Sequence, residues 1–282
     1  MATLFNRTKL ITIAALLTLA ASQHASAATI TFGGQVATDD SGKTSLKVNA
    51  DNTINPGFFV ETFDTATAVQ GVTPANNTTY NVDGASDGCA INSPLDISFG
   101  PGTPDGTEIL GVRNDSVSSV AAAPAGDTTC YAYTTPAVNG VDSYVDIDYS
   151  EFLATIGTEV DPSLAGSTIS YLGFYWGSVD NYNSFEFYSG TDLVASITGN
   201  ELLTSLRGTA GDQVDDRSNV YVNIDFTFAE AFDKFRVITS GVAGEFDNVT
   251  IGLEQRPVTA PGSLAFLGLG LLGLGLGRRF KK

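Results

Sequence analysis

The stretch NVYVNIDFTF, residues 219–228, carries the pattern that decides the fold class. Its apolar residues are Val220, Val222, Ile224, Phe226 and Phe228. Each of them is preceded by Asn, Tyr, Asp or Thr, so apolar and more polar residues alternate one by one. Successive side chains of a strand point to opposite faces, so a period of two predicts a β-strand with one buried face.

Nine further runs have the same β-like composition, with Gly, Asp, Asn and Pro between them. They are residues 29–34, 57–63, 95–100, 143–149, 167–177, 183–190, 192–199, 232–240 and 245–254. Only two short segments, 150–157 and 201–208, suit a helix. This pattern predicts an all-β fold, an antiparallel two-sheet sandwich of the jelly-roll kind.

The composition changes along residues 28–257, the segment we expect to form this sandwich. Residues 28–142 are rich in Thr, Ala, Gly and Asn, whereas aromatic residues are concentrated between Tyr171 and Tyr188. We expect one ectodomain with a looser 28–142 part and an aromatic-rich 143–257 part. Two domains divided near residues 140–165 are the alternative.

The charge balance disfavours one class of partner. The chain has 14 Lys and Arg against 31 Asp and Glu, a formal charge of −17, and six of its basic residues lie near the two ends. Nucleic-acid binding needs a clustered positive surface, so we expect no nucleic-acid partner.

The N-terminal segment, 1–27, has the three parts of a secretory signal peptide. A basic start precedes the apolar run at 10–21, and Ala-Ser-Ala follows at 25–27. The alternative, a membrane anchor, needs a longer apolar run, of about 20 residues. We therefore expect signal peptidase to cleave between Ala27 and Ala28, which removes His24, the single histidine.

Export bears on the two cysteines, Cys89 and Cys130. They form an even pair without a CxxC motif, in a chain expected in an oxidising compartment. A disulfide between them is the favoured interpretation, and two buried free thiols are the alternative.

The C-terminal segment, 258–282, has three parts as well. Val258-Thr259-Ala260-Pro261-Gly262 comes first, a Leu/Gly run follows at 264–277, and Arg278 and Arg279 begin a basic end. A helix over this run would span about 21 Å, less than the roughly 30 Å of a bilayer core. A short C-terminal membrane helix is the alternative to a sorting signal.

This tail resembles the PEP-CTERM sorting signal of exopolysaccharide-producing Gram-negative bacteria. Pro261, the Leu/Gly run and the Arg pair fit that family, while Thr259 and Ala260 stand where it usually has Pro and Glu. The resemblance implies a transient anchor in the inner membrane and processing by an exosortase near the motif. It also implies release to the cell surface, outer membrane or extracellular matrix.

A second resemblance covers much of residues 122–251. The blocks AAPAGDTTCYAY (122–133), YLGFYWGSVDNYNSFEFYSG (171–190), LVASITG (193–199), YVNIDF (221–226) and EFDNVTI (245–251) look like a family of exosortase-dependent surface proteins. That resemblance implies a destination and no biochemical activity.

Oxygen-bearing side chains suggest one cofactor, a structural calcium ion. Asp180 and Asn183 follow a Trp-Gly turn, and Asp247 lies in the last strand. Calcium takes six to eight oxygen ligands, so these three are candidate ligands. Asp and Asn also favour turns for backbone reasons, which is the alternative explanation.

Aromatic side chains suggest a ligand, since rings stack on sugars. Tyr175, Trp176 and Tyr182 are the candidates, although the alternation of residues 171–176 also suits a buried Trp176 and a more exposed Tyr175 and Tyr182. Catalysis by paired carboxylates would use Glu186 or Glu245.

Together these features predict an exported, non-enzymatic surface or matrix protein, with exopolysaccharide as the candidate ligand. A secreted carbohydrate-active enzyme and a permanently tail-anchored structural protein are the alternatives.

Overall fold

The computed structural model describes residues 28–64, 89, 96–99, 110–134, 136–137 and 139–255, with only the backbone of residues 96–99. The expected signal peptide and sorting tail lie outside these residues. So do the processing residues Ala27, Val258 to Gly262, Arg278 and Arg279.

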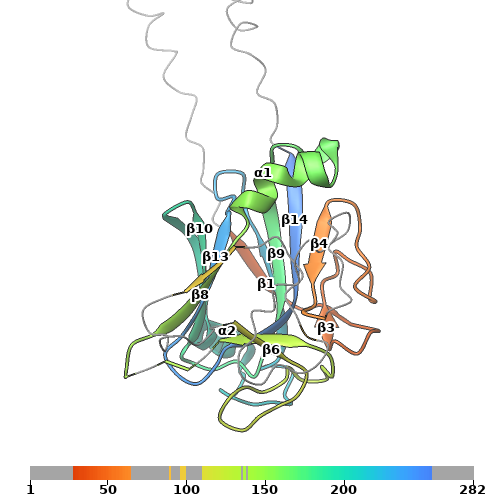
Figure 1. Ribbon diagram of the computed structural model, residues 1–282. Coiled ribbons are helices and arrows are strands. Elements are labelled where there is room, and N and C mark those ends of the chain that lie inside the picture. The colour runs from red at the N-terminus through yellow and green to blue at the C-terminus, as the bar shows by residue number, and fades with distance from the viewer. Residues whose placement is uncertain are drawn as a thin grey trace, which may run out of the picture.

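The described chain is mostly β-strand, and its paired strands are antiparallel (Figure 1). The larger sheet has the order β1 (Thr29–Phe32), β12 (Val220–Asp225), β9 (Ser167–Gly177), β14 (Glu245–Gln255), β7 (Tyr131–Thr134), β6 (Leu110–Arg113), and β4 (Phe58–Glu61) also pairs with β14. The second sheet has the order β11 (Asp192–Thr198), β10 (Asn183–Ser189), β13 (Lys234–Thr239), β8 (Ser143–Asp148), β5 (Asp96–Phe99). A small ribbon joins β2 (Gln35–Val36) and β3 (Lys43–Thr44).

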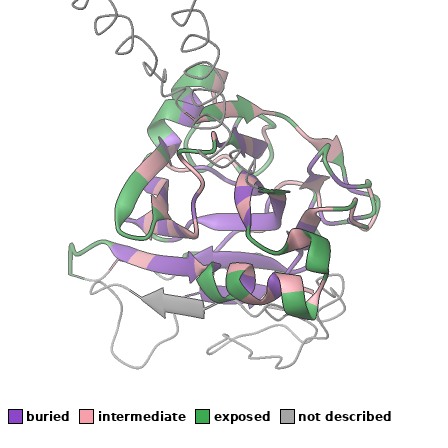
Figure 2. Cartoon of the chain, turned by 90° about the horizontal axis from the view of Figure 1, so that it is seen from above, coloured by how far each residue is buried: buried purple, intermediate pink, exposed green. Residues whose placement is uncertain are grey.

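Aromatic rings join the two larger sheets. Phe185 of β10 has its ring centroid 4.2 Å from that of Phe174 and 4.7 Å from that of Trp176, both in β9. The ring centroid of Phe246 in β14 lies 6.4 Å from that of Phe235 in β13. These side chains are fully buried, and Figure 2 shows the buried strands between more exposed loops. Buried rings of both larger sheets therefore belong to one hydrophobic core.

The predicted strands correspond to observed ones, with ends that differ by a few residues. In β10 the side chains alternate between buried and half-buried, as a strand with one covered face should. The strands β6 and β7 were not predicted, because each is too short to show a period of two. Since β4, β6 and β7 join β9 and β14 in one sheet, the 28–142 part and the 143–257 part share a core.

Two helices accompany the sheets, α1 (Ser150–Glu159) and α2 (Gly199–Leu206), with a 3₁₀ turn, η2 (Pro162–Leu164), after α1. Both helices lie where the sequence suggested them. Thr198 and Glu201 form a reciprocal capping box that starts α2. Within the described ranges, no helix has the length and apolar character needed to cross a membrane.

The predicted disulfide is confirmed. Cys89 and Cys130 are bonded with their Cα atoms 5.5 Å apart, and both are buried. The backbone N–H of Cys130 also donates to the carboxylate of Asp64. The bond therefore ties residue 89 to the segment that leads directly into β7.

Candidate functional site

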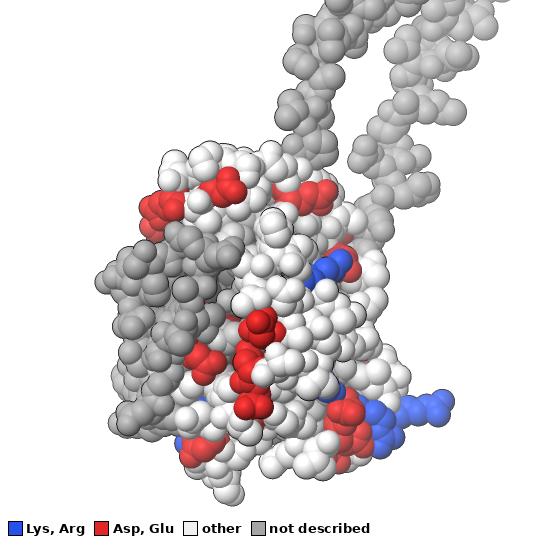
Figure 3. All heavy atoms as spheres, turned by 90° about the vertical axis from the view of Figure 1, so that its right-hand side faces the viewer, with Lys and Arg blue, Asp and Glu red and all other residues white. Residues whose placement is uncertain are grey.

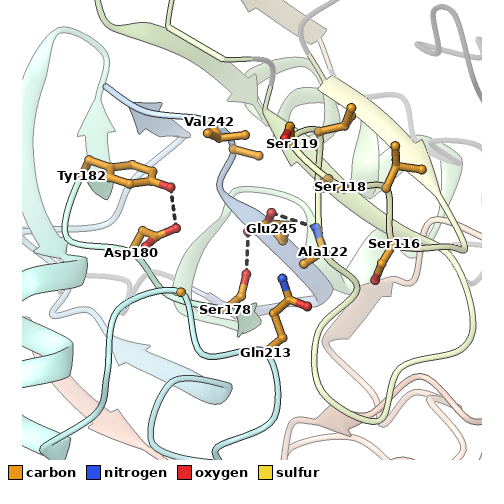
Figure 4. A pocket seen from close by; sticks show the side chains of 15 residues that line it. Ser116, Ser118, Ser119, Ala122, Ser178, Asp180, Tyr182, Gln213, Val242 and Glu245 are labelled. Carbon is orange, nitrogen blue, oxygen red and sulfur yellow. Dashed lines mark hydrogen bonds between the residues drawn. The ribbon is translucent and has the colours of Figure 1, made fainter.

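A cavity of about 420 Å³ opens where β9 ends and β14 begins (Figure 4). Four chain segments line it: residues 116–122, residues 178–182, the loop with Gly211 and Gln213, and residues 242–245. Ligand sites of proteins commonly have volumes of about 300–1,000 Å³. This cavity is therefore large enough for a small ligand.

Strand pairing brings these segments together. Gly177 ends β9 and is paired with Glu245, which begins β14. The chain then turns through Ser178, whose φ is 35°, and Val179 donates its N–H to the carbonyl of Ser218. As a result the loop that leaves β9 and the loop that enters β14 meet at the same end of these two strands.

Glu245 lies at the base of the cavity. One carboxylate oxygen accepts the N–H of Ala122 at 3.0 Å, and the other accepts the hydroxyl of Ser178 at 3.1 Å (Figure 4). Burial raises the pKa of Glu245 to about 7, against the lowering effect of these hydrogen bonds. The side chain thus changes its charge near neutral pH and links the 116–122 loop to the sheet.

Asp180 is a second acidic residue of the cavity lining, next to Tyr182 (Figure 4). Its carboxylate accepts a hydrogen bond from the hydroxyl of Tyr182 at 2.5 Å. Burial raises the pKa of Asp180, and its negative charge raises the pKa of Glu245 in turn. The cavity therefore contains two carboxyl groups, and the charge of one affects the ionisation of the other.

Neutral polar groups complete the lining. Ser116, Ser118, Ser119 and Gln213 are exposed and also line the cavity, together with Val242 (Figure 4). Hydroxyl and amide groups both donate and accept hydrogen bonds. Such a lining suits a ligand that itself carries many hydroxyl groups.

The three predicted ligand-facing aromatics separate in the structure. Tyr182 lines the cavity, so it lies where a ligand can reach it. The prediction is wrong for Trp176, which is buried in the core, and for Tyr175, which is also fully buried. The hydroxyl of Tyr175 donates to the carbonyl of Ala125 at 2.6 Å, since a loop covers this face of β9.

The three predicted calcium ligands do not form one group. Asn183 is buried and donates its amide to the carbonyl of Ala243 at 2.7 Å, near the cavity that Asp180 lines. Asp247 lies beside Asp127 instead. Among the residues that the structure describes, no set of three or more His, Cys, Asp or Glu side chains is arranged to hold a metal ion.

The two glutamates considered for catalysis also lie in different places. Glu245 lines the cavity, while Glu186 lies on the outer face of β10, where it accepts the hydroxyl of Tyr188. The carboxyl group that shares the cavity with Glu245 is that of Asp180. The sequence suggested Asp180 as a calcium ligand and Glu245 as a catalytic carboxylate, and it did not place the two in one site.

The acidic character predicted from composition extends over the surface. Figure 3 shows Asp and Glu over several parts of one face, with Lys and Arg gathered mainly at one corner. Such a surface disfavours polyanionic ligands.

Comparison with protein-family models, curated proteins and solved structures finds no match to this chain.

Proposed function

We propose that this chain is an exported, non-enzymatic protein of the cell surface or extracellular matrix that binds a neutral exopolysaccharide in the Asp180–Glu245 cavity. The observation that carries this proposal is the lining of the cavity: serine hydroxyls, the Gln213 amide and two carboxyl groups beside the Tyr182 ring. Polar planar groups and an aromatic ring together match the hydroxyls and apolar faces of a sugar.

Export is supported by the disulfide, because such bonds persist in oxidising compartments. Export is also supported by a contact at Ala28, the expected new N-terminus. The nitrogen of Ala28 lies 3.1 Å from a carboxylate oxygen of Glu230. Cleavage after Ala27 would convert this amide into an ammonium group that pairs with Glu230.

The sequence supports the fold type and the processing of the C-terminal segment. The two facing antiparallel sheets are interpreted as a jelly-roll-like sandwich, and residues 258–282 as a PEP-CTERM-like sorting helix that an exosortase removes. The partners of the chain during export are then signal peptidase and the exosortase. Permanent anchoring by this tail is the alternative.

The rival function, a carbohydrate-active enzyme, rests on the two carboxyl groups of the cavity. The pKa of Glu245, raised to about 7, suits a general acid. However, both of its oxygens already accept hydrogen bonds from Ala122 and Ser178, which fixes the side chain as a link between chain segments. This geometry favours binding over catalysis.

Calorimetric titration with oligosaccharides of the host exopolysaccharide tests the proposal. We expect binding by the full chain, a loss of about tenfold or more in affinity for Asp180→Asn and Gln213→Ala, and no change for the exposed control Asp192→Asn. Equal affinity in all variants would exclude this cavity as the site. Release of reducing ends that Glu245→Gln abolishes would instead establish the enzyme.

A further inference from the structure

A pair of buried carboxyl groups lies apart from the cavity, between β14 and the turn that precedes β7. Asp247 is fully buried, and neither of its carboxylate oxygens accepts a hydrogen bond from a donor group among the described residues. Asp127 is 6% exposed. One carboxylate oxygen of Asp127 accepts hydrogen bonds from the N–H and the hydroxyl of Thr129. The other oxygen of Asp127 accepts no hydrogen bond from the described residues.

The surroundings of this pair are acidic as well. The carboxyl groups of Asp127 and Asp247 interact with each other, and the charges of Asp64 and Asp39 also act on Asp247. The ammonium of Lys43, which lies over the Tyr175 ring, pairs with Asp216 at 2.7 Å. Buried carboxylates without a compensating positive charge are strongly unfavourable, so a shared proton or a cation must accompany this pair.

The two carboxyl groups come from segments that meet at a distortion of β14. Asp247 lies at an irregularity of β14, where the register with β9 shifts between Asp247 and Thr250, and the next residue, Asn248, has a φ of 49°. Asp127 is bridged to Ser41 in the N-terminal segment. The carboxyl groups thus come from separate segments that meet at a distorted strand, and an ion between them would hold these segments together.

We propose that Asp127 and Asp247 bind a calcium ion, and that neutral oxygens of the surrounding turns and water supply its remaining ligands. Calcium accepts six to eight oxygens in flexible geometry, so two carboxylates without a third acidic ligand are sufficient. Its charge would neutralise the pair, and carboxylate oxygens suit a hard cation better than a transition metal. This site shares only Asp247 with the set expected from the sequence, and it is independent of the carbohydrate cavity.

The test uses the full chain from an exporting host, with its disulfide intact and stripped of metal by a chelator. Calorimetric titration with calcium chloride should give about one ion per chain, and Tm should rise by about 5–10 °C at one hundred times the dissociation constant. Asp247→Asn and Asp127→Asn should each abolish the binding heat and this rise. The control Asp180→Asn, in the carbohydrate cavity, should retain both.

Two results would overturn the proposal. If the unsubstituted chain gives no heat and no shift in Tm with calcium, while Asp247→Asn is as stable as the unsubstituted chain at neutral pH, the pair shares a proton. If Asp180→Asn abolishes binding and Asp127→Asn does not, the ion lies in the other cavity. The titration of the unsubstituted chain shows whether calcium binds at all, even where a variant fails to fold.

Discussion

Replacing Glu245 by Gln tests the electrostatics of the cavity. The two side chains have nearly the same shape, and the Gln oxygen can still accept the N–H of Ala122. Its amide group can donate to the hydroxyl of Ser178, which donates to Glu245 in the unsubstituted chain. The substitution therefore removes a titrating carboxyl group and leaves the contacts largely in place.

The pKa of Glu245 gives the expected size of the effect. It rises from 4.5 to about 7 on folding, because the side chain is buried. The folded protein then keeps a proton over a pH range in which the unfolded chain has lost it. The stabilisation from this group is fully present below about pH 4.5 and is lost as the pH rises through about 7, with a total of about 3 kcal/mol.

Urea denaturation at about pH 4 and about pH 8 measures this difference. We expect the free energy of unfolding of Glu245→Gln to fall less between the two pH values than that of the unsubstituted chain, by about 2–3 kcal/mol. Glu254→Gln, an exposed position on the same strand, is the matched control and should behave like the unsubstituted chain. Identical pH dependence in Glu245→Gln and the unsubstituted chain would refute the assignment of a raised pKa to this residue.

Three further predictions concern stability. Phe185→Ala removes a fully buried ring that contacts Phe174 of the other sheet, and it should lower the free energy of unfolding by about 3–5 kcal/mol. Phe228→Ala, at a position that is 36% exposed, is the control and should lower the free energy of unfolding far less. Equal losses in denaturant titrations would contradict the packing of the sheets. Replacing Cys89 and Cys130 together by Ala should cost about 4 kcal/mol, measured by thermal unfolding against the oxidised chain, and an unchanged Tm would mean that the bond constrains little. Thr198→Ala breaks the capping box of α2 and should cost about 1 kcal/mol, while Thr198→Ser should restore most of the loss.

The long strands could be predicted because they carry enough alternating residues. Residues 143–149 and 183–190 show a clear period of two, and each corresponds to an observed strand with buried side chains along it. The short strands β6 and β7 carry no such signal. Their place in the larger sheet is set by pairing with β14 and with each other, which no local pattern reveals.

The burial of Tyr175 shows why alternation alone misplaces an aromatic residue. The outer face of β9 also carries Tyr171, whose hydroxyl contacts that of Ser45 at 2.6 Å, and Gly173, where a Cβ would overlap the rings of neighbouring tyrosines. This face is covered by segments far away in the sequence. A residue on it therefore appears exposed in a local pattern although tertiary contacts bury it.

The candidate site was only partly visible in the sequence. Asp180 was predicted as a calcium ligand and Glu245 was considered as a catalytic carboxylate, so the two were not placed in one site. The serines of the 116–122 loop and Gln213 carried no signal, because small polar residues in loops are common. Asp127 was missed for a related reason. Its hydrogen bonds to Thr129 form an ordinary turn, which conceals the second, buried oxygen of the same carboxyl group.

We propose that the chain is exported and then loses both of its ends. The most direct test is the intact mass of the protein recovered from the culture medium and from the membranes of its native host. We expect a released form that begins at Ala28 and ends between Val258 and Gly262. A membrane-bound form that retains Arg278 and Arg279, with no released form in the medium, would contradict it.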